Sequence, residues 1–564
     1  MDIKKIAAAA AAAAMVTSGC GKTIEKNKDP YTRPVTTTTT TVTEATLPAP
    51  VTEPPEPVIP EYDEVKIKAG ELTYTEYSEL RHAETGVLAG GAVVAADREG
   101  YHGDGYVTGI TSDGDWAVYF DLPETQYYNI TVTAAADEKL KCSLSVNDGK
   151  ISEFTSGGTG EFESFTFKNI RLEKGKSRIA LVPDEKAAFA PDVDSIEIVS
   201  SEDITKLPLT VKKTTALSNK NADYKTQAVY SFICESYGKK IILGQYDVID
   251  TEERNYETEL IYRTTGKYPA IRFGDVRLLT AGKDCEEAAQ AELDAAIKYS
   301  KDGGLVGLMW NWLSVPGEGD NLSFELENSE LNIKDAVTEE DIAELDIEEI
   351  RQLNEDGVIS DECLQIVEDI DTVSEGLKKL RNKGVTVLWR PLHEASNGYY
   401  WWGKDKKSYK WLWGLMYDRM TGYHELNNLI WVWSAQNSGW YVGDKKCDIL
   451  SVDVYSDNGS KDGQVNSLLY MSSVSTKKPI AMSECGSLPL VQSLADERAM
   501  WAYIGQWGVE RLVSGDGSIA EEYNKTEDLI KIYNSDIAIT RDELPDFEEK
   551  AKELKEKDES EAEE

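Results

Sequence analysis

Two glutamates of this 564-residue chain follow apolar runs at points where a buried strand is expected to end. Glu394 comes five residues after the run 385–389, and Glu484 comes two residues after the run 479–482. A carboxylate at the end of a buried strand is costly unless it is paired or used. Two such carboxylates at the carboxyl ends of strands are typical of a barrel active site with two working acids.

Two carboxyl groups on opposite sides of a barrel mouth can cleave a glycosidic bond. One must be protonated to release the leaving oxygen, and one must be ionised to attack the sugar carbon; retaining enzymes hold them ~5–5.5 Å apart. Mutual repulsion helps to keep one of them protonated near neutral pH. We therefore expect Glu394 and Glu484 to face each other. The alternative of Cys485 as a nucleophile would need His393 or His424 as its base, and no motif supports it.

The elements that would position this pair lie between about residue 216 and residue 545. Apolar strand-like runs alternate there with helical stretches, which predicts a parallel sheet buried on both faces. Seven or eight such units in ~330 residues fit an eightfold barrel better than an open sheet. We predict an α/β fold, a (β/α)8 barrel over residues 205–545, with an acidic insertion over 318–360. The expected strands are Lys240–Leu243, Ala270–Phe273, Leu305–Met309, Val385–Trp389, Leu429–Trp433, Ile449–Val454 and Ile480–Met482.

Residues 65–200 show a different pattern, with short alternating runs separated by Gly, Asn and Asp. Examples are the runs 116–120, 128–133, 142–146 and 195–199. Many short strands at regular spacing predict an all-β sandwich. The barrel is therefore expected to follow a sandwich module.

The first 20 residues read as an export signal. Lys4 and Lys5 precede an apolar stretch over 6–16 that is too short for a mature transmembrane helix. Cys20 follows, and the segment resembles a bacterial lipoprotein signal in which Cys20 is lipidated and becomes the mature N-terminus. An ordinary signal peptide cleaved nearby is the alternative. We expect an exported protein that is lipid-anchored at the bacterial cell surface or secreted.

Two further segments are expected to lie outside the folded modules. Residues 21–64 are rich in Thr and Pro and lack apolar content, which predicts a disordered linker that holds the rest off a surface. Residues 546–564 form an acidic tail, helical or disordered, to which the sequence assigns no function.

The bulk composition excludes several classes of partner. With 101 acidic and 60 basic residues the net charge is −41, so nucleic acid and anionic lipid would be repelled, whereas a neutral sugar would not. The cysteines other than Cys20 contain no CxxC pair and fit isolated thiols better than a disulfide framework. Membrane contact is expected only through the lipid anchor. Twelve of the 13 Trp lie between Trp310 and Trp507, and aromatic faces suit the C–H face of a pyranose.

Four ordered motifs between residues 216 and 545 resemble glycoside hydrolase family 26, a β-mannanase family. They are the segments 389–403, 431–437, 453–455 and 482–486, which read WRPLHEASNGYYWWG, WVWSAQN, DVY and MSECG. The resemblance implies that Glu394, on the fourth strand, is the acid/base and Glu484, on the seventh, is the nucleophile. It implies a retaining endo-β-1,4-mannanase that needs no cofactor and no metal for catalysis.

The same resemblance implies a set of sugar-binding residues. His393 should bond the sugar or position the acid, Tyr455 should hydrogen-bond Glu484, and Trp507 should form the floor under the sugar. Of the adjacent pair 401–402, one Trp is expected to point inward and the other, Trp402, to line the cleft. Two further positions contact sugar in the family but differ here: Tyr399 stands where a Trp is usual, and Asn311 where many members have His.

The sandwich resembles a family 35 carbohydrate-binding module across about 130 residues. The order of its Gly-Asp-Gly-Tyr-Val, Tyr-Asn-Ile-Thr-Val and Asp-Val-Asp-Ser-Ile segments carries the resemblance. Such modules bind plant polysaccharides, often with structural calcium. The two acidic ligands that usually open the family would be Glu76 and Ser78, so the second is missing. A spacer domain without a ligand is the alternative.

The expected partner is a plant cell-wall polysaccharide, mannan or glucomannan, bound by a monomer. A mixed-linkage β-1,3-1,4-glucanase on the same scaffold is the nearest alternative, because the changes at Tyr399 and Asn311 weaken the choice of mannose over glucose. A non-catalytic surface polysaccharide-binding protein is the alternative from another class, and the presence of both Glu394 and Glu484 argues against it.

Overall fold

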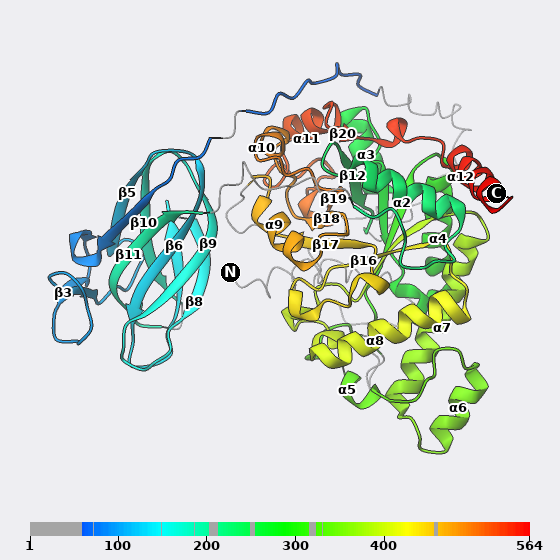
Figure 1. Cartoon of the computed structure of the whole chain (residues 1–564), viewed down its shortest axis with the longest axis horizontal. Coiled ribbons are helices and arrows are strands. Elements are labelled where there is room, and N and C mark those ends of the chain that lie inside the picture. Colours follow the sequence, from blue (N-terminus) through cyan, green and yellow to red (C-terminus); the bar gives the residue numbers. More distant parts are fainter. Residues whose placement is uncertain are drawn as a thin grey trace, which may run out of the picture. The chain divides into compact units, whose positions relative to one another are not determined.

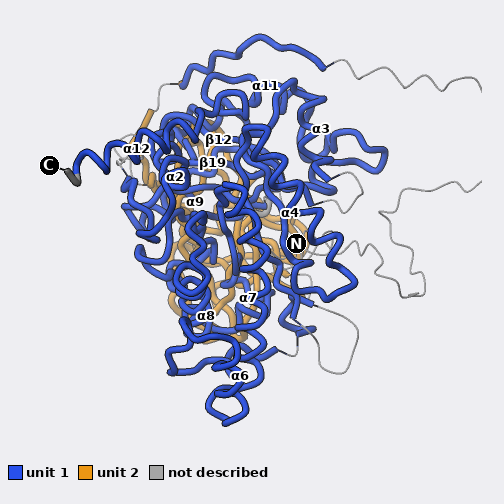
Figure 2. Tube along the Cα trace, turned by 90° about the vertical axis from the view of Figure 1, so that its right-hand side faces the viewer, with its two compact units in different colours: residues 1–69, 210–455, 461–564 blue, residues 70–209, 456–460 orange. Residues whose placement is uncertain are grey.

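The computed structural model describes residues 59–70, 73–147, 149–184, 187–201, 213–248, 254–314, 323–329, 331–455 and 461–563. The chain divides into two compact units (Figures 1 and 2). One contains the described residues up to Ala69, those from Lys213 to Tyr455 and those from Lys461 on; the other contains the described residues from Gly70 to Ser201. The predicted export signal with Cys20, and the linker up to residue 58, lie outside the described residues.

The smaller unit is a sandwich of two antiparallel sheets. One sheet has the order β3-β4-β11-β6-β9, with β1 also paired to β11, and the other has the order β2-β5-β10-β7-β8. Alternate residues of each strand enter the core between the sheets, among them Val118, Phe120, Ile130 and Val132. The strands are β1 (Ser78–His82), β2 (Val87–Leu88), β3 (Val93–Ala95), β4 (Tyr106–Thr108), β5 (Trp116–Leu122), β6 (Gln126–Ala135), β7 (Lys141–Val146), β8 (Gly149–Thr155), β9 (Glu163–Leu172), β10 (Gly175–Pro183) and β11 (Asp192–Ser200).

The segment before the sandwich belongs to the other unit, which corrects the predicted boundary at residue 65. Val65 donates its amide to the carbonyl of Asn534 at 2.7 Å, and the amide of Ile67 donates to Asp536 at 2.9 Å. The hydroxyl of Tyr62, within the predicted linker, donates to the carbonyl of Thr264. Two backbone amides and one side-chain hydroxyl of this segment thus bond the larger unit. The low apolar content of the segment does not reveal these contacts.

The larger unit is a closed barrel of eight parallel strands, as predicted. Strand β12 pairs with both β13 and β19, so the sheet has no edge between them. The strands are β12 (Ile241–Tyr246), β13 (Ile271–Asp275), β14 (Leu305–Trp310), β15 (Val387–Pro391), β16 (Leu429–Trp433), β17 (Ile449–Val454), β18 (Ile480–Cys485) and β19 (Tyr503–Gln506), with the short β20 (Ala538–Ile539) on β12.

Helices surround these strands (Figure 1). They are α2 (Tyr224–Ser236), α3 (Tyr256–Thr265), α4 (Glu286–Lys301), α7 (Asp361–Arg381), α8 (Lys406–Asp418), α9 (Val465–Val474), α10 (Val491–Asp496) and α11 (Thr526–Tyr533). The insertion after β14 contains α5 (Ile333–Ala336) and α6 (Ile347–Glu355), and the acidic tail forms α12 (Phe547–Glu563), whose Phe547 packs on Phe232 of α2. No helix of the described segments has the length and apolarity needed to cross a membrane.

The barrel interior is filled by an aromatic ring that requires glycine around it. A Cβ on Gly244 of β12 or on Gly307 of β14 would come within 2.4 Å of the Phe273 ring. Tyr246 stacks on that ring at 4.7 Å. Glycines on the two neighbouring strands therefore make room for the Phe273 ring. The hydroxyl of Tyr246, which stacks on this ring, points toward the carboxyl end of the barrel, where it bonds Arg390.

Candidate active site

Glu394 and Glu484 both lie at the carboxyl-terminal end of the barrel. Glu394 comes three residues after the end of β15, and Glu484 is the penultimate residue of β18. Their exposed fractions are 5% and 4%. The strands are parallel, so the two side chains share one end of the barrel, where barrel enzymes place their catalytic groups.

A β-bulge sets the position of Glu484. Asp453 of β17 lies in register with Glu484, although Val452 pairs with Met482, so β18 carries one extra residue at Ser483. The opposite neighbour of the bulge is Gly505 of β19, where a Cβ would stand 2.2 Å from the Ser483 carbonyl oxygen. Only glycine therefore fits beside the bulge that carries Glu484.

Two donors hold the Glu484 carboxylate. Arg390 Nη1 donates to Oε1 at 2.5 Å, and the Tyr455 hydroxyl donates to Oε2 at 2.7 Å. The hydrogen bond expected from Tyr455 is thus present. A guanidinium and a phenol on the two oxygens stabilise negative charge on Glu484 and fix its plane.

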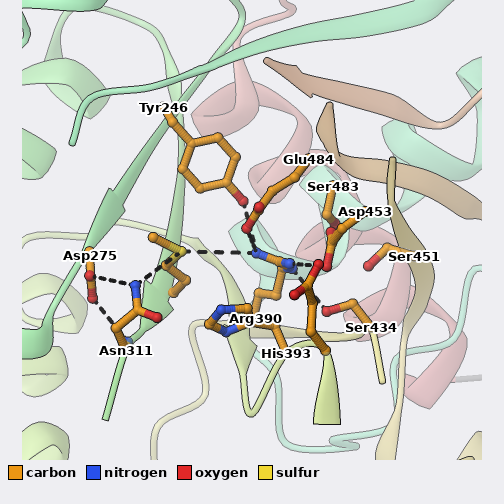
Figure 3. Close-up of polar contacts among 12 residues, drawn as sticks. Tyr246, Asp275, Asn311, Arg390, His393, Ser434, Ser451, Asp453, Ser483 and Glu484 are labelled. Atoms are coloured by element: carbon orange, nitrogen blue, oxygen red, sulfur yellow. Dashed lines mark hydrogen bonds and ion pairs between the residues drawn. The ribbon is translucent and has the colours of Figure 1, made fainter. Parts of the chain in front are cut away.

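Arg390 is the centre of this site, although the sequence assigned it no role (Figure 3). Besides Glu484, its guanidinium binds Asp453, Ser434 Oγ at 3.0 Å and the Tyr246 hydroxyl at 3.1 Å. Arg390 and Asp453 are charged residues near strand ends, like Glu484, so their positions in the sequence could have marked both as candidate site residues. Which charges meet depends on strand register, which the sequence does not show.

The electrostatics of the site favour a neutral Glu394. Burial, with the charges of Asp453 and Glu484 adding to it, raises the pKa of Glu394 well above its usual range, against a smaller opposing effect of Arg390. Burial likewise raises the pKa of Asp453 to about 7, opposed by Arg390. One guanidinium faces three carboxyl groups here, so a proton is retained on the group least well paired.

The turn that carries Glu394 is strained. Leu392 and Glu394 have φ of 52° and 50°, a region that non-glycine residues rarely adopt. The Glu394 amide donates to the Ser434 carbonyl at 2.9 Å, and Asn397 Nδ2 donates to Glu394 Oε2 at 3.2 Å. Strain of this kind persists where surrounding contacts fix the backbone, and it is frequent at active sites.

His393 lies between the two strained residues and is held neutral. Its Nε2 shares a hydrogen bond of 2.9 Å with the Tyr400 hydroxyl, while Nδ1 is buried without a hydrogen-bond partner among the described residues. Burial and the charge of Arg390 lower the pKa of His393 well below its usual value. A neutral imidazole with one unused nitrogen can hydrogen-bond a sugar hydroxyl.

The prediction that Trp402 lines the cleft is wrong for this structure. Both Trp401 and Trp402 are fully buried. The Trp402 ring stacks on Tyr400 at 4.4 Å, and its Nε1 donates to the His393 carbonyl at 2.9 Å. Trp402 therefore supports the His393 turn from behind.

The two residues that depart from the family pattern take different positions. Asn311 Nδ2 donates to Asp275 at 2.9 Å, and its Oδ1 is buried without a hydrogen-bond partner in the described segments. Tyr399 is half-buried, and its hydroxyl donates to Glu325 at 2.5 Å. Among the described residues Tyr399 makes no hydrogen bond to the Arg390 cluster, whereas Asn311 is linked to Arg390 through Met309, whose sulfur accepts from Asn311 Nδ2 and from Arg390 Nη1, each at 4.0 Å. Neither Asp275 nor Glu325 was anticipated from the sequence.

Trp507 adjoins the cluster through Tyr246. Its ring lies 5.0 Å from the Tyr246 ring, and its exposed fraction is 3%. Its amide donates to the carbonyl of Cys485 at 2.9 Å, which ties the loop after β19 to the end of β18. Trp507 thus lies next to Tyr246, whose hydroxyl accepts a hydrogen bond from Arg390.

Cys485 does not have the character of a nucleophile. Its side chain is 1% exposed, and burial, followed by the charge of Glu484, raises the pKa of its thiol. A thiol that stays protonated is a poor nucleophile. His393, its proposed base, is bonded to Tyr400, and His424 to Asp371.

The residues present do not fit the calcium site expected in the sandwich. Glu76 and Ser78 are both exposed. Across the described residues no group of three His, Cys, Asp or Glu stands close enough to hold a metal ion. One exposed carboxylate supplies far fewer than the about 6–8 oxygen ligands that calcium takes.

A parallel eight-stranded barrel that brings a neutral and a cation-bound glutamate to one end is the architecture of a glycoside hydrolase. Residues 218–543 match the family described as Glycosyl hydrolase family 26. The chain belongs to that family and is a glycoside hydrolase.

Several known proteins resemble the chain over most of its length. It is 30% identical to a mannan endo-1,4-beta-mannosidase of Thermothelomyces thermophilus, over 82% of this chain and 89% of that protein. It is 29% identical to mannan endo-1,4-beta-mannosidase B of a Piromyces species, over 82% and 77%. A crystal structure of a Podospora anserina GH26-CBM35 beta-(1,4)-mannanase superposes with a TM-score of 0.50 at 29% identity, covering 83% of this chain and 99% of that one.

Proposed function

We propose that the protein is an endo-β-1,4-mannanase that hydrolyses mannan-type hemicellulose with retention of configuration. The observation that carries the mechanism is the contrast between Glu484, bound by Arg390 and Tyr455, and Glu394, whose pKa is raised by burial and neighbouring charges. The names of the similar proteins support mannan as the substrate.

In the first step Glu484 attacks the anomeric carbon and forms a glycosyl ester, while Glu394 gives its proton to the departing glycosidic oxygen. In the second step Glu394 takes a proton from water, whose oxygen attacks the anomeric carbon and releases Glu484. Arg390 and Tyr455 balance the charge of Glu484 before the ester forms and again when the ester is cleaved. No cofactor takes part in either step.

Trp507, His393 and Asn311 are proposed to bind the sugar. An indole ring offers an apolar face to the sugar ring. His393 Nδ1 and Asn311 Oδ1 have no hydrogen-bond partner among the described residues, and hydroxyls of a bound sugar would supply one. Tyr399, which bonds Glu325, is proposed to contact the neighbouring sugar unit.

Product analysis on four polysaccharides tests the substrate. We expect oligosaccharides from mannan and glucomannan, with β-anomeric products in the first seconds by NMR. If oligosaccharides are released only from mixed-linkage β-glucan, the protein is a glucanase and not a mannanase. First products in the α-anomeric form would overturn the retaining mechanism. Xylan is the negative control.

A Glu484→Ala variant separates catalysis from binding. We expect turnover to fall by several orders of magnitude with the fold intact, because the nucleophile is lost. Unchanged activity would remove Glu484 from the mechanism. Absence of turnover in the unaltered protein, together with polysaccharide binding, would favour a non-catalytic binding protein.

We further propose that the sandwich binds polysaccharide and that Cys20 carries a lipid anchor. The similarity to a structure named GH26-CBM35 supports the first proposal, and the Lys4, apolar and Cys20 pattern supports the second. Affinity electrophoresis of residues 70–201 in mannan gels tests binding. Incorporation of a palmitate analogue that is lost in Cys20→Ser tests the anchor.

A further inference from the structure

A second set of buried charges lies outside the catalytic pair, around the start of α3. Asp247 follows β12, Glu257 lies on α3, Arg272 on β13 and Glu292 on α4, and none is more than 6% exposed. Arg272 binds both oxygens of Glu292, at 2.5 and 3.0 Å, and its Nε lies 3.7 Å from Asp247 Oδ2. One guanidinium cannot neutralise three buried carboxylates, so one of them retains a proton.

The hydrogen bonds indicate which carboxyl group is neutral. Asp247 Oδ1 accepts the amides of Glu257 and Thr258 at 2.8 and 3.3 Å, whereas its Oδ2 accepts no hydrogen bond among the described residues. A proton on Glu257 would supply that missing donor. Burial, with the charge of Asp247 adding to it, raises the pKa of Glu257 well above its usual range.

The other oxygen of Glu257 reaches the loop after β19. Oε1 accepts the amide of Val509 at 3.1 Å and that of Val248 at 3.4 Å. Gly508 packs against the same oxygen, since a Cβ there would stand 2.2 Å from it. Val509 has a φ of 52°, which is strained for a β-branched residue. This turn directly follows Trp507.

We propose that Glu257 is a positioning residue for Trp507: its neutral carboxyl group bridges Asp247 and the Val509 amide and thereby fixes the turn over 507–509. The titratable and charged groups that face it are Asp247 after β12 and Arg272 on β13. Behind them on α4, Glu292 pairs with Arg272, and Tyr299 interacts with Arg272 and Asp247. Loss of the proton puts a second charge against Asp247 and releases the turn. Only the link from Trp507 to sugar rests on the proposed function.

Hydrogen exchange in the sugar-free protein tests the bridge. After correction for intrinsic rates, we expect the peptide over 503–512 to exchange about tenfold faster at pH 9 than at pH 6 in the unaltered chain. Glu257→Gln can donate to Asp247 and accept from Val509 but cannot ionise, so its exchange should not depend on pH. Glu257→Ala should exchange fast at both, and the peptide over β16 is the reference. Equal pH dependence in the unaltered chain and Glu257→Gln would overturn the proposal.

Kinetics on mannan test the consequence for substrate. Glu257→Ala should raise KM more than it lowers kcat, because a misplaced platform weakens binding, and Glu257→Gln should recover most of the loss. An unaltered protein without turnover on mannan would overturn the proposed function, while the exchange experiment still decides the role of Glu257. Equal KM in all three proteins would overturn the link from Glu257 to Trp507.

Discussion

The Tyr455 hydroxyl lies 2.7 Å from Oε2 of Glu484, while Arg390 occupies the other oxygen of the same carboxylate. The two donors come from different strands, β15 and the end of β17, and they leave the carboxylate one orientation. A group held in this way reacts without first reorganising, which is how a fixed polar environment lowers a barrier.

Replacing Tyr455 by Phe removes this hydrogen bond and keeps the ring. We expect kcat to fall about 10- to 100-fold with KM little changed, since a hydrogen bond to a charged group is worth about 1.5–3 kcal/mol. Tyr441→Phe is the matched control. The Tyr441 hydroxyl donates a hydrogen bond of the same length, 2.7 Å, but to Asp444 and not to Glu484. Equal losses in both variants would contradict a specific role for Tyr455.

The role of Glu394 as a proton donor predicts a dependence on the leaving group. Glu394→Gln should lose at least about 10³-fold in kcat on mannan. In kcat/KM, which reports the first step alone, it should lose far less on a dinitrophenyl β-mannobioside, whose leaving oxygen needs no proton. Initial rates on both substrates provide the measurement, and similar losses on the two would show that Glu394 is not the acid.

The bulge beside Gly505 predicts that one methyl group disrupts the site. In Gly505→Ala the new Cβ would meet the Ser483 carbonyl at 2.2 Å, so β18 must shift and displace Glu484. We expect kcat to fall more than about tenfold and the free energy of unfolding to drop by about 1–3 kcal/mol. Gly515→Ala, where nothing lies within 4 Å of the added Cβ, should change neither. A fully active Gly505→Ala enzyme would show that the bulge tolerates movement.

Asp369 of α7 predicts a pH-dependent stability. It accepts a hydrogen bond from Trp312 Nε1 at 2.7 Å, and burial raises its pKa to about 7. The unfolded value is about 3.9, so the folded state binds more protons between the two values and the free energy of unfolding falls as pH rises from about 4 to about 7.

In Asp369→Asn the free energy of unfolding should therefore fall by about 1–3 kcal/mol less over this pH range than in the unaltered protein. Urea denaturation at pH 5 and pH 8 measures it, with the exposed Asp294→Asn on α4 as control. Parallel pH dependence in the unaltered protein and Asp369→Asn would assign the decline to other groups.

The sequence predicted the barrel because buried parallel strands leave uninterrupted apolar runs, and it located Glu394 and Glu484 because both interrupt that pattern. It did not predict that Arg390, Asp453 and Glu484 meet, since this depends on register across three strands. Trp402 was misplaced because two adjacent Trp residues look alike until the turn of His393 is known. The partner of Tyr399, Glu325, lies 74 residues away in the insertion, where no short-range pattern marks it.

The backbone pairing of Val65 with Asn534 makes the catalytic unit discontinuous in sequence, with the sandwich interposed between its first strip and the remainder. A chain that begins at residue 213 would therefore lack the sandwich and also the segment before it, which belongs to the catalytic unit. A shortened enzyme should therefore be made by deleting the sandwich and joining the two parts of the catalytic unit, rather than by truncating the chain from its N-terminus.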